Sequence, residues 1–285
     1  MKNYVVIQCN SMVQLYFGLA VALTKFEYET TTFFLKTGEI NGRKLEFDFS
    51  SYPNIHDFNS SNFIKARDQS GFKAVVISAS HLPLALILKL GPLNIKELIR
   101  VEEGIGSYGS TFTKLRELFI AGYPRLLPRH LAGILASKFL ENTKMQKAIF
   151  LFDGKLLCNA RLLTTLRFVI SELSANEKLA SSTGTLVLSS DYLSKHQTHW
   201  PNAIIKEHPA WGKASAESNL NRLSAEEIIY RSDVDTVISE FSSTSVYAPV
   251  LFGSLSVCFS TKTYYNRLSR KQKELFDRYC EVIIQ

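Results

Sequence analysis

The stretch YVVIQCNSMVQLYFGLAVA, residues 4–22, indicates what kind of fold this chain adopts. Tyr4–Cys9 is a short apolar run of the kind that forms a buried strand, and Met12–Leu23 is a longer helical pattern after a polar turn. Polar residues interrupt the apolar character at Gln8, Asn10, Ser11 and Gln14. Because no uninterrupted apolar run approaches spanning length, we interpret the segment as strand, turn and helix, and not as a signal peptide.

The same pairing of a strand with a helix continues along the chain, which is typical of βαβ units and a parallel sheet. The strands expected in the first half are Tyr4–Cys9, Thr31–Leu35, Lys73–Ser78 and Leu98–Glu102, and Asn41-Gly42 is the expected turn of a hairpin. The helices expected there are Met12–Leu23, Leu82–Leu90, Thr111–Ala121 and Arg129–Leu140.

A second series begins after the polar stretch 141–147, which we interpret as a hinge. Its expected strands are Ala148–Phe152, Thr185–Leu188, Ala203–Lys206, Thr236–Ser239 and Leu255–Phe259, and its expected helices are Arg161–Glu172 and Lys271–Val282. We therefore predict an α/β fold of the GT-B type, with two Rossmann-like domains, residues 1–145 and 146–285, facing a central cleft. The last helix either stays on the second domain or crosses back to the first.

The composition and net charge of the chain indicate which kinds of binding partner to expect. The 285 residues are 46% hydrophobic and 21% charged, as in ordinary globular proteins, and the net charge is +7. This charge favours an anionic partner: nucleic acid, a phosphorylated small molecule or an anionic membrane surface. The four cysteines are scattered without CxxC spacing, which argues against a structural zinc site. We expect a cytoplasmic protein with reduced cysteines.

Three polar motifs follow expected strands, at the edge where open α/β sheets bind ligands. They are Glu102-Glu103-Gly104, the KEHPAW of Lys206–Trp211 and the SEFSSTS of Ser239–Ser245. Each also has a plain interpretation: a solvated turn, a strand terminator, and a helix cap whose hydroxyls satisfy free amides. A capping position is nevertheless also an anion site, because the same amides and the helix dipole attract phosphate.

In this order the motifs resemble those of bacterial sialyltransferases, in particular the families that build lipooligosaccharide sialosides and capsular polysialic acid. The opening stretch is similar too, although the usual Thr-Pro-Leu-Gln reads Ser-Met-Val-Gln here, from Ser11 to Gln14. The resemblance implies an inverting glycosyltransferase. Its donor is CMP-sialic acid or a related CMP-nonulosonic acid, and its acceptor is a hydroxyl of a cell-surface glycan, lipooligosaccharide or capsule.

The resemblance also implies roles for individual residues. Glu103 would be the general base in the acceptor-side domain, and Glu102 would orient it or raise its pKa. His208 would bind or protonate the leaving phosphate, with Pro209 fixing its backbone. The other implied substrate-binding residues are Ser242, Ser243 and Thr244 at the phosphate, Lys206 as a nearby charge, Glu240 at the ribose, Gly104 where the acceptor approaches, and Ser11 and Gln14 in the opening turn.

The leaving group, CMP, is a monophosphate whose charge histidine, hydroxyls and helix amides can carry. We therefore expect no metal and no other cofactor. Asp233-Val234-Asp235 matches the DxD signature of metal-dependent glycosyltransferases. It directly precedes an expected strand, however, and we interpret it as a helix-to-strand turn.

Other functions stay open. A CDP-glycerol or ribitol-type polyol-phosphate transferase would use a similar frame but relies on two histidines, and no histidine of the first half occupies the place of Glu103. A basic nucleic-acid-binding protein would explain the charge, but the chain lacks any helix-turn-helix, zinc-finger or aromatic RNA-binding signature. A third possibility is an inactive relative that serves as an assembly partner.

The basic C-terminal segment offers a contact with the inner face of the cytoplasmic membrane. Its basic residues are Lys262, Arg267, Arg270, Lys271, Lys273 and Arg278. Each would contribute about 1 kcal/mol close to anionic lipid. The alternative is a solvated helix face with no such contact.

Overall fold

The computed structural model describes residues 3–40, 43–44, 47–79, 82–102, 104, 146–152, 157–174, 179, 184–190, 192–195, 200–207 and 223–285. These residues divide into two compact units. The first contains the described residues up to 102, residues 146–151 and Asn159–Leu166. The second contains residue 104, residues 152 and 157–158, and the described residues from 167 to 285.

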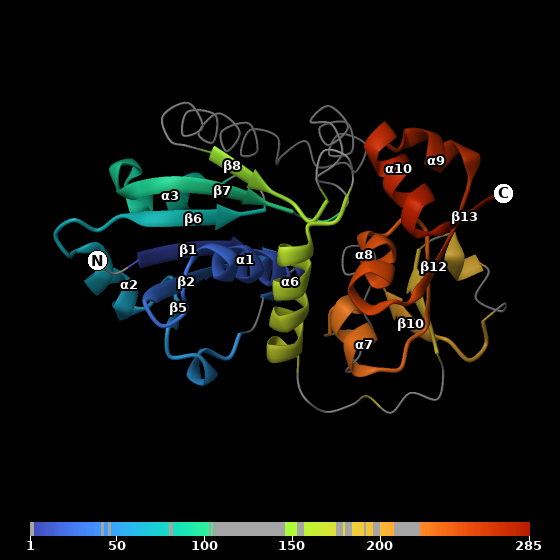
Figure 1. The fold of residues 1–285 in the computed structure, drawn as a ribbon, viewed down its shortest axis with the longest axis horizontal. Coiled ribbons are helices and arrows are strands. Elements are labelled where there is room, and N and C mark those ends of the chain that lie inside the picture. The colour runs from blue at the N-terminus through green and yellow to red at the C-terminus, as the bar shows by residue number, and fades with distance from the viewer. Residues whose placement is uncertain are drawn as a thin grey trace. The chain divides into compact units, whose positions relative to one another are not determined.

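The first unit is built on a six-stranded, fully parallel sheet of order β5-β2-β1-β6-β7-β8 (Figure 1). Its strands are β1 (Asn3–Cys9), β2 (Thr31–Thr37), β5 (Ile55–Asp57), β6 (Ala74–Ser78), β7 (Ile95–Val101) and β8 (Gln146–Ile149). This is the strand order of the Rossmann fold. The expected strands of the first half are therefore confirmed.

Helices cover both faces of this sheet. Alternate residues of β1 point to opposite sides, so each face presents apolar side chains that a helix can bury. On one face α1 (Met12–Lys25) packs so closely that a Cβ on Gly18 would lie 2.5 Å from Ile7 Cγ2. On the other face Val6 belongs to a core shared with Phe63 of α2 (Ser61–Arg67) and Leu86 of α3 (Leu84–Leu90). The strand and helix expected from the opening stretch are thus the centre of a three-layer unit.

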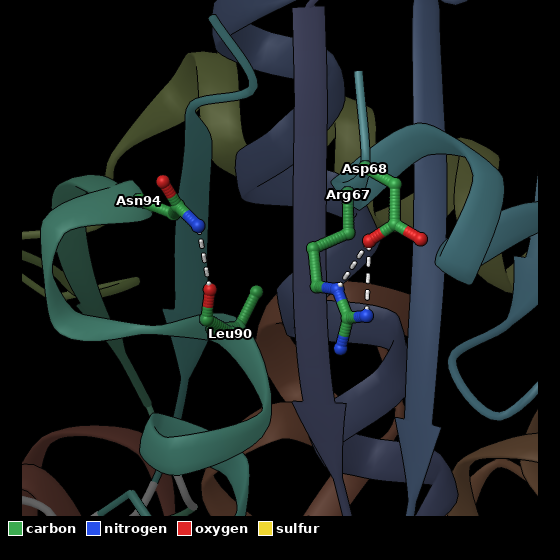
Figure 2. Close-up of polar contacts among 4 residues, drawn as sticks. All are labelled: Arg67, Asp68, Leu90 and Asn94. Carbon is green, nitrogen blue, oxygen red and sulfur yellow. Dashed lines mark hydrogen bonds and ion pairs between the residues drawn. The ribbon is translucent and has the colours of Figure 1, made fainter. Parts of the chain in front are cut away.

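Polar side chains close the ends of α2 and α3, as Figure 2 shows. Arg67 Nε and one terminal nitrogen donate to Asp68 Oδ1 at 3.0 and 2.9 Å. Asn94 Nδ2 donates to the Leu90 carbonyl at 2.9 Å, which satisfies one of the carbonyls left open where a helix ends. These residues precede β6 and β7, so they lie at the amino ends of the strands, away from the edge where a ligand is expected.

Short elements between β2 and β6 differ from expectation in part. A hairpin does form between β3 (Glu39–Ile40) and β4 (Arg43–Lys44), while its predicted turn, Asn41-Gly42, lies outside the described residues. The strand β5 and helix α2 were not predicted. The remaining short elements among the described residues of this unit are the 3-10 turns η1 (Phe49–Ser51) and η2 (Pro92–Asn94).

The strand expected at Ala148–Phe152 is assigned to the wrong domain by the sequence interpretation. Strand β8 begins at Gln146, inside the stretch we interpreted as a hinge, and pairs with β7 from Leu98 to Val101. The predicted boundary at residue 145 is therefore too early. The helix α6 (Ala160–Leu173) follows, and the division between the units falls after its residue Leu166.

The second unit contains a five-stranded parallel sheet of order β10-β9-β11-β12-β13, which is the flavodoxin-like strand order. Its strands are β9 (Thr185–Ser189), β10 (Ile204–Glu207), β11 (Thr236–Ser239), β12 (Leu255–Ser260) and β13 (Glu281–Ile284). Its helices are α7 (Ala225–Arg231), α8 (Ser243–Phe252), α9 (Lys262–Arg267) and α10 (Arg270–Tyr279). Helices α7 and α8 share a core with Leu186 and Val237 on one face of the sheet, while Val187 and Ile238 face the other way.

The C-terminus corrects two expectations. The helix predicted to reach Val282 ends at Tyr279, and the β-branched residues that follow form β13 beside β12. Helix α10 buries Leu275 and Phe276 within the second unit, where the Phe276 ring lies 4.8 Å from that of Phe241. The alternative in which the last helix crosses back to the first domain is therefore wrong.

The expected helices Thr111–Ala121 and Arg129–Leu140 lie outside the described residues. In the part of the chain that the structure describes, no helix has both the length and the apolar character needed to cross a membrane.

Candidate functional site

In an open parallel sheet, ligands bind beyond the carboxyl ends of the strands, where the strand order reverses. In the second sheet this point lies between β9 and β11, since β10 lies on one side of β9 and the later strands lie on the other. The chain leaves β11 through Glu240 and Phe241 and enters α8. We call the hydroxyl residues around this turn the hydroxyl cluster: Ser239, Ser242, Ser243, Thr244 and Ser245.

The hydroxyl cluster holds its own turn together. Ser242 is the N-cap of α8, and its Oγ accepts a hydrogen bond from Thr244 N at 3.4 Å. Ser242 N donates to Ser239 Oγ at 3.3 Å, and Ser239 Oγ shares a hydrogen bond with Ser245 Oγ. The capping role considered for these residues is confirmed for Ser242. The hydroxyl cluster therefore lies at the N-terminus of a ten-residue helix, the positive end of the helix dipole, where anions are stabilised.

Phe241 makes this turn sharp. Its φ of 55° lies in the left-handed region, which a bulky side chain rarely adopts. The ring is anchored by Tyr264, Tyr265 and Phe276, with centroids 5.9, 5.7 and 4.8 Å away. Strained backbone of this kind costs about 1–3 kcal/mol and concentrates at functional sites. Sequence reasoning missed Phe241, because nothing in the local pattern signals a positive φ at phenylalanine.

Gly104, the last residue of the acidic motif, lies against the hydroxyl cluster. A Cβ added to Gly104 would lie 2.6 Å from Ser243 Oγ and 3.3 Å from Ser243 Cβ. Its φ of +116° also excludes ordinary side chains. Gly104 belongs to the second unit, so two residues that are far apart in the sequence, Gly104 and Ser243, are in contact within that unit.

Glu102 is fully buried at the end of the first sheet. Its Oε2 accepts a hydrogen bond from Leu151 N at 2.8 Å, which ties the residue after β7 to the segment after β8. The side chain is thus engaged inside the first unit. This hydrogen bond gives Glu102 a structural role in the first unit. Glu103, the adjacent carboxylate, lies outside the described residues.

Replacing Glu102 with Ala should lower the free energy of unfolding by about 1–3 kcal/mol, because the buried Leu151 amide loses its acceptor. Glu102→Gln keeps a carbonyl acceptor and should lose less. Urea unfolding measures both. The matched control is Glu97→Ala on the same strand, where the surface ion pair with Lys25, at 2.9 Å, is worth about 0–1 kcal/mol. A Glu102→Ala protein as stable as Glu97→Ala would show that the hydrogen bond contributes nothing.

Thr244 contacts Glu226, a residue that sequence reasoning did not single out. Thr244 Oγ1 donates to Glu226 Oε1 at 2.8 Å, and the charge of Lys206 acts on the same carboxyl. Burial raises the pKa of Glu226, while the hydrogen bond from Thr244 and the nearby Lys206 oppose the rise. The sequence shows Glu226 only as part of an acidic first turn after Ser224, the N-cap of α7, so its burial could not be inferred.

Two further predicted residue sets have structural partners. Glu240 Oε1 accepts from Ser260 Oγ at 3.2 Å, and Ser260 is buried at the carboxyl end of β12. In the first unit Gln14 N donates to Ser11 Oγ at 3.3 Å, and Gln14 Oε1 accepts from Asn10 N at 2.7 Å. Ser11 and Gln14 therefore hold the turn between β1 and α1 in the structure.

The remaining predicted residues, Glu103, His208 and Pro209, lie outside the described residues. Strand β10, which ends at Glu207, leads directly to His208 in the sequence. This strand end is at the same edge of the sheet as the end of β11, because the strands are parallel.

Asp233 and Asp235 form the helix-to-strand turn that we expected. Helix α7 ends at Arg231, and β11 begins at Thr236. The Asp235 carboxylate covers Gly184, where an added Cβ would meet it at 2.7 Å. The pair is therefore at the amino end of β11, opposite to the hydroxyl cluster. Among the described residues, no group of three or more His, Cys, Asp or Glu side chains is arranged to hold a metal.

The basic C-terminal residues lie on α9 and α10. Arg270 pairs with Glu274 at 3.2 Å on the exposed face of α10, and Lys273 Nζ lies 5.0 Å from the centre of the Tyr265 ring. Helix α10 buries its apolar residues and turns these charges outward, as a solvated helix face does.

Comparison of the sequence with protein-family models gives no match, and comparison with curated proteins gives no match either. The function must therefore be argued from the arrangement of the residues.

Proposed function

We propose that this protein is a CMP-sialic-acid-dependent sialyltransferase. It would move sialic acid, or a related nonulosonic acid, from its CMP donor to a hydroxyl of a cell-surface glycan such as lipooligosaccharide or capsule. The supporting fold is α/β with two parallel sheets, and we propose that the two units act as the halves of a GT-B enzyme.

One observation carries this proposal: Gly104 touches Ser243. Gly104 follows Glu103 directly in the sequence, so a base at position 103 is a single residue away from the hydroxyl cluster. An acid beside an anion site is what transfer from a CMP-sugar needs, because one group must activate the acceptor while the other receives the leaving phosphate.

In the proposed reaction, Glu103 takes the proton of the acceptor hydroxyl while its oxygen attacks the anomeric carbon of the donor. The bond to the phosphate oxygen of CMP breaks on the opposite face, so the configuration inverts. The N-terminus of α8, Ser242 and Ser243 stabilise the charge on the departing phosphate, and His208 donates a proton or a hydrogen bond to it. No step needs a metal.

The test is donor hydrolysis followed by product analysis. The protein should release CMP from CMP-sialic acid in the presence of EDTA, and mass spectrometry should detect a sialylated product on a panel of glycan acceptors. Parallel incubation with CDP-glycerol distinguishes the polyol-phosphate transferase. Release of CMP from CDP-glycerol but not from CMP-sialic acid would overturn the assignment, and loss of turnover in EDTA would overturn the metal-free mechanism.

Ser243→Ala should weaken CMP binding by about 1–3 kcal/mol, the usual range for a lost hydrogen bond to a charged group. The hydroxyl contacted by Gly104 would then be missing from the phosphate site. Calorimetry with CMP measures the effect. Ser171→Ala is the control, since Ser171 Oγ bonds only locally, to the Phe168 carbonyl at 2.7 Å on the exposed surface of α6. Equal CMP affinity in both variants would remove Ser243 from the phosphate site.

A further inference from the structure

Two cysteines that α9 and α10 separate in the sequence lie together in the second unit. Cys258 is on β12, and Cys280 directly precedes β13, whose Glu281 pairs with Val257. Both are free thiols, of which Cys258 is fully buried and Cys280 is partly exposed. Their side chains hydrogen-bond to each other, which lowers the pKa of Cys258 and raises the pKa of Cys280. The two sulfurs therefore form a contacting pair.

Both thiols also contact the hydroxyl cluster. Cys280 Sγ donates to the Ser245 carbonyl at 3.4 Å, and Cys258 Sγ lies 3.7 Å from Ser239 Oγ. Ser239 and Ser245 are hydrogen-bonded through their hydroxyls, and Ser239 Oγ accepts from the amide of Ser242, the N-cap of α8. The pair of thiols is thus joined by direct contacts to the turn that begins α8.

A pair of thiols differs chemically from a single buried cysteine. An isolated buried cysteine packs as a small apolar residue, and Cys9 is of this kind, because burial raises its pKa to about 12 and keeps it protonated. Two thiols in contact ionise as a unit, since the thiol that keeps its proton stabilises the thiolate of the other. The thiolate is the form that reacts with oxidants.

We propose that Cys258 and Cys280 form a redox-modification site, in which a hydroperoxide converts the two thiols to a disulfide that disturbs the hydroxyl cluster. The first sulfur attacks one oxygen of the hydroperoxide. The O–O bond breaks, the proton of that thiol goes to the departing oxygen, and the sulfur becomes a sulfenic acid. The second sulfur then attacks the sulfenic sulfur, so that an S–S bond forms, the S–O bond breaks and water leaves with the second proton.

The disulfide acts on the hydroxyl cluster because it has no S–H group. The Ser245 carbonyl loses its donor, and both sulfurs move to a bonded separation of about 2.0 Å. For CMP the inference rests on the proposed function, which places the phosphate at this cluster. We expect the oxidised protein to bind CMP about tenfold more weakly, as for the loss of one hydrogen bond.

The first experiment detects the modification without any ligand. The full-length reduced protein is treated with hydrogen peroxide at low protein concentration, its remaining thiols are alkylated, and its peptides are mapped by mass spectrometry. We expect a disulfide between Cys258 and Cys280 within one chain, alkylated Cys9 and Cys158, and full reversal by dithiothreitol. A disulfide between two copies of the chain, or no disulfide at these positions, would overturn the redox site.

The second experiment measures CMP affinity by calorimetry before and after peroxide. Cys280→Ser keeps a donor for the Ser245 carbonyl but cannot form the disulfide, so it should bind CMP like the reduced wild type in both conditions. Cys158→Ser is the matched control, since it removes a cysteine outside the pair and should keep the peroxide sensitivity of the wild type.

The outcomes distinguish the two proposals. If the reduced wild type does not bind CMP, the proposed function fails and the effect on CMP falls with it, while the peptide map still decides the redox site. If the disulfide forms and CMP affinity does not change, the link to the hydroxyl cluster is overturned. If Cys280→Ser loses CMP affinity after peroxide as the wild type does, the loss comes from another oxidation, and the link is likewise overturned.

Discussion

Glu103→Gln should abolish sialyl transfer while leaving CMP affinity close to that of the wild type. A general base is needed only when the acceptor hydroxyl loses its proton, whereas in the proposed function CMP would bind at the hydroxyl cluster of the second unit. Removing a general base typically slows a reaction by about 10²–10⁴-fold. Transfer rates with CMP-sialic acid and a glycan acceptor give the first quantity, and calorimetry with CMP gives the second.

Glu102→Gln is the matched control for this variant. The two carboxylates are adjacent, but Glu102 is buried and bound to the Leu151 amide, which a glutamine carbonyl can still satisfy. We therefore expect Glu102→Gln to retain most of the transfer activity. His208→Ala should reduce both CMP affinity and turnover, because that residue would touch the leaving phosphate. A dead Glu102→Gln with an active Glu103→Gln would place the base on the other carboxylate, and full activity in both would refute the sialyltransferase assignment.

Gly104→Ala should lower transfer by about 100-fold, because a displacement on the order of 1 Å at a reacting group can cost that much. The added Cβ would lie 2.6 Å from Ser243 Oγ, and the backbone φ of +116° is strained for any L-residue. Both effects push apart the acidic motif and the first residue of α8. Transfer rate and CMP affinity should therefore fall together.

Gly253→Ala is the control that distinguishes backbone strain from the steric contact with Ser243. Gly253 ends α8 with a φ of +76°, and no heavy atom lies within 4 Å of an added Cβ. This variant should lose stability through backbone strain, about 1 kcal/mol or more, but keep its CMP affinity. If Gly104→Ala and Gly253→Ala are equally stable and lose the same transfer activity, the contact between Gly104 and Ser243 does not contribute to function. The double variant Gly104→Ala/Ser243→Ala relieves only the Oγ contact, so it should not restore CMP binding.

Local patterns in the sequence predicted most of the described elements. The strand at Tyr4–Cys9, its helix and the strand Thr236–Ser239 were expected from apolar periodicity, which depends on near neighbours alone. Two strands were misinterpreted, because no local pattern records which sheet a strand joins. Strand β8 was given to the second domain, and β13 was interpreted as the end of a helix.

The candidate site shows the same division. The sequence by itself determined the residue types: an acidic pair before glycine, a His-Pro, and a serine-rich helix start, each recognisable from neighbouring residues. Only the tertiary structure decided that Gly104 touches Ser243, that Glu102 is buried against Leu151, and that the Thr244 hydroxyl donates to the buried Glu226. Helix caps and strand ends are set by interactions within a few residues of the chain. A buried contact between distant residues depends on how whole elements pack, and no local pattern records that.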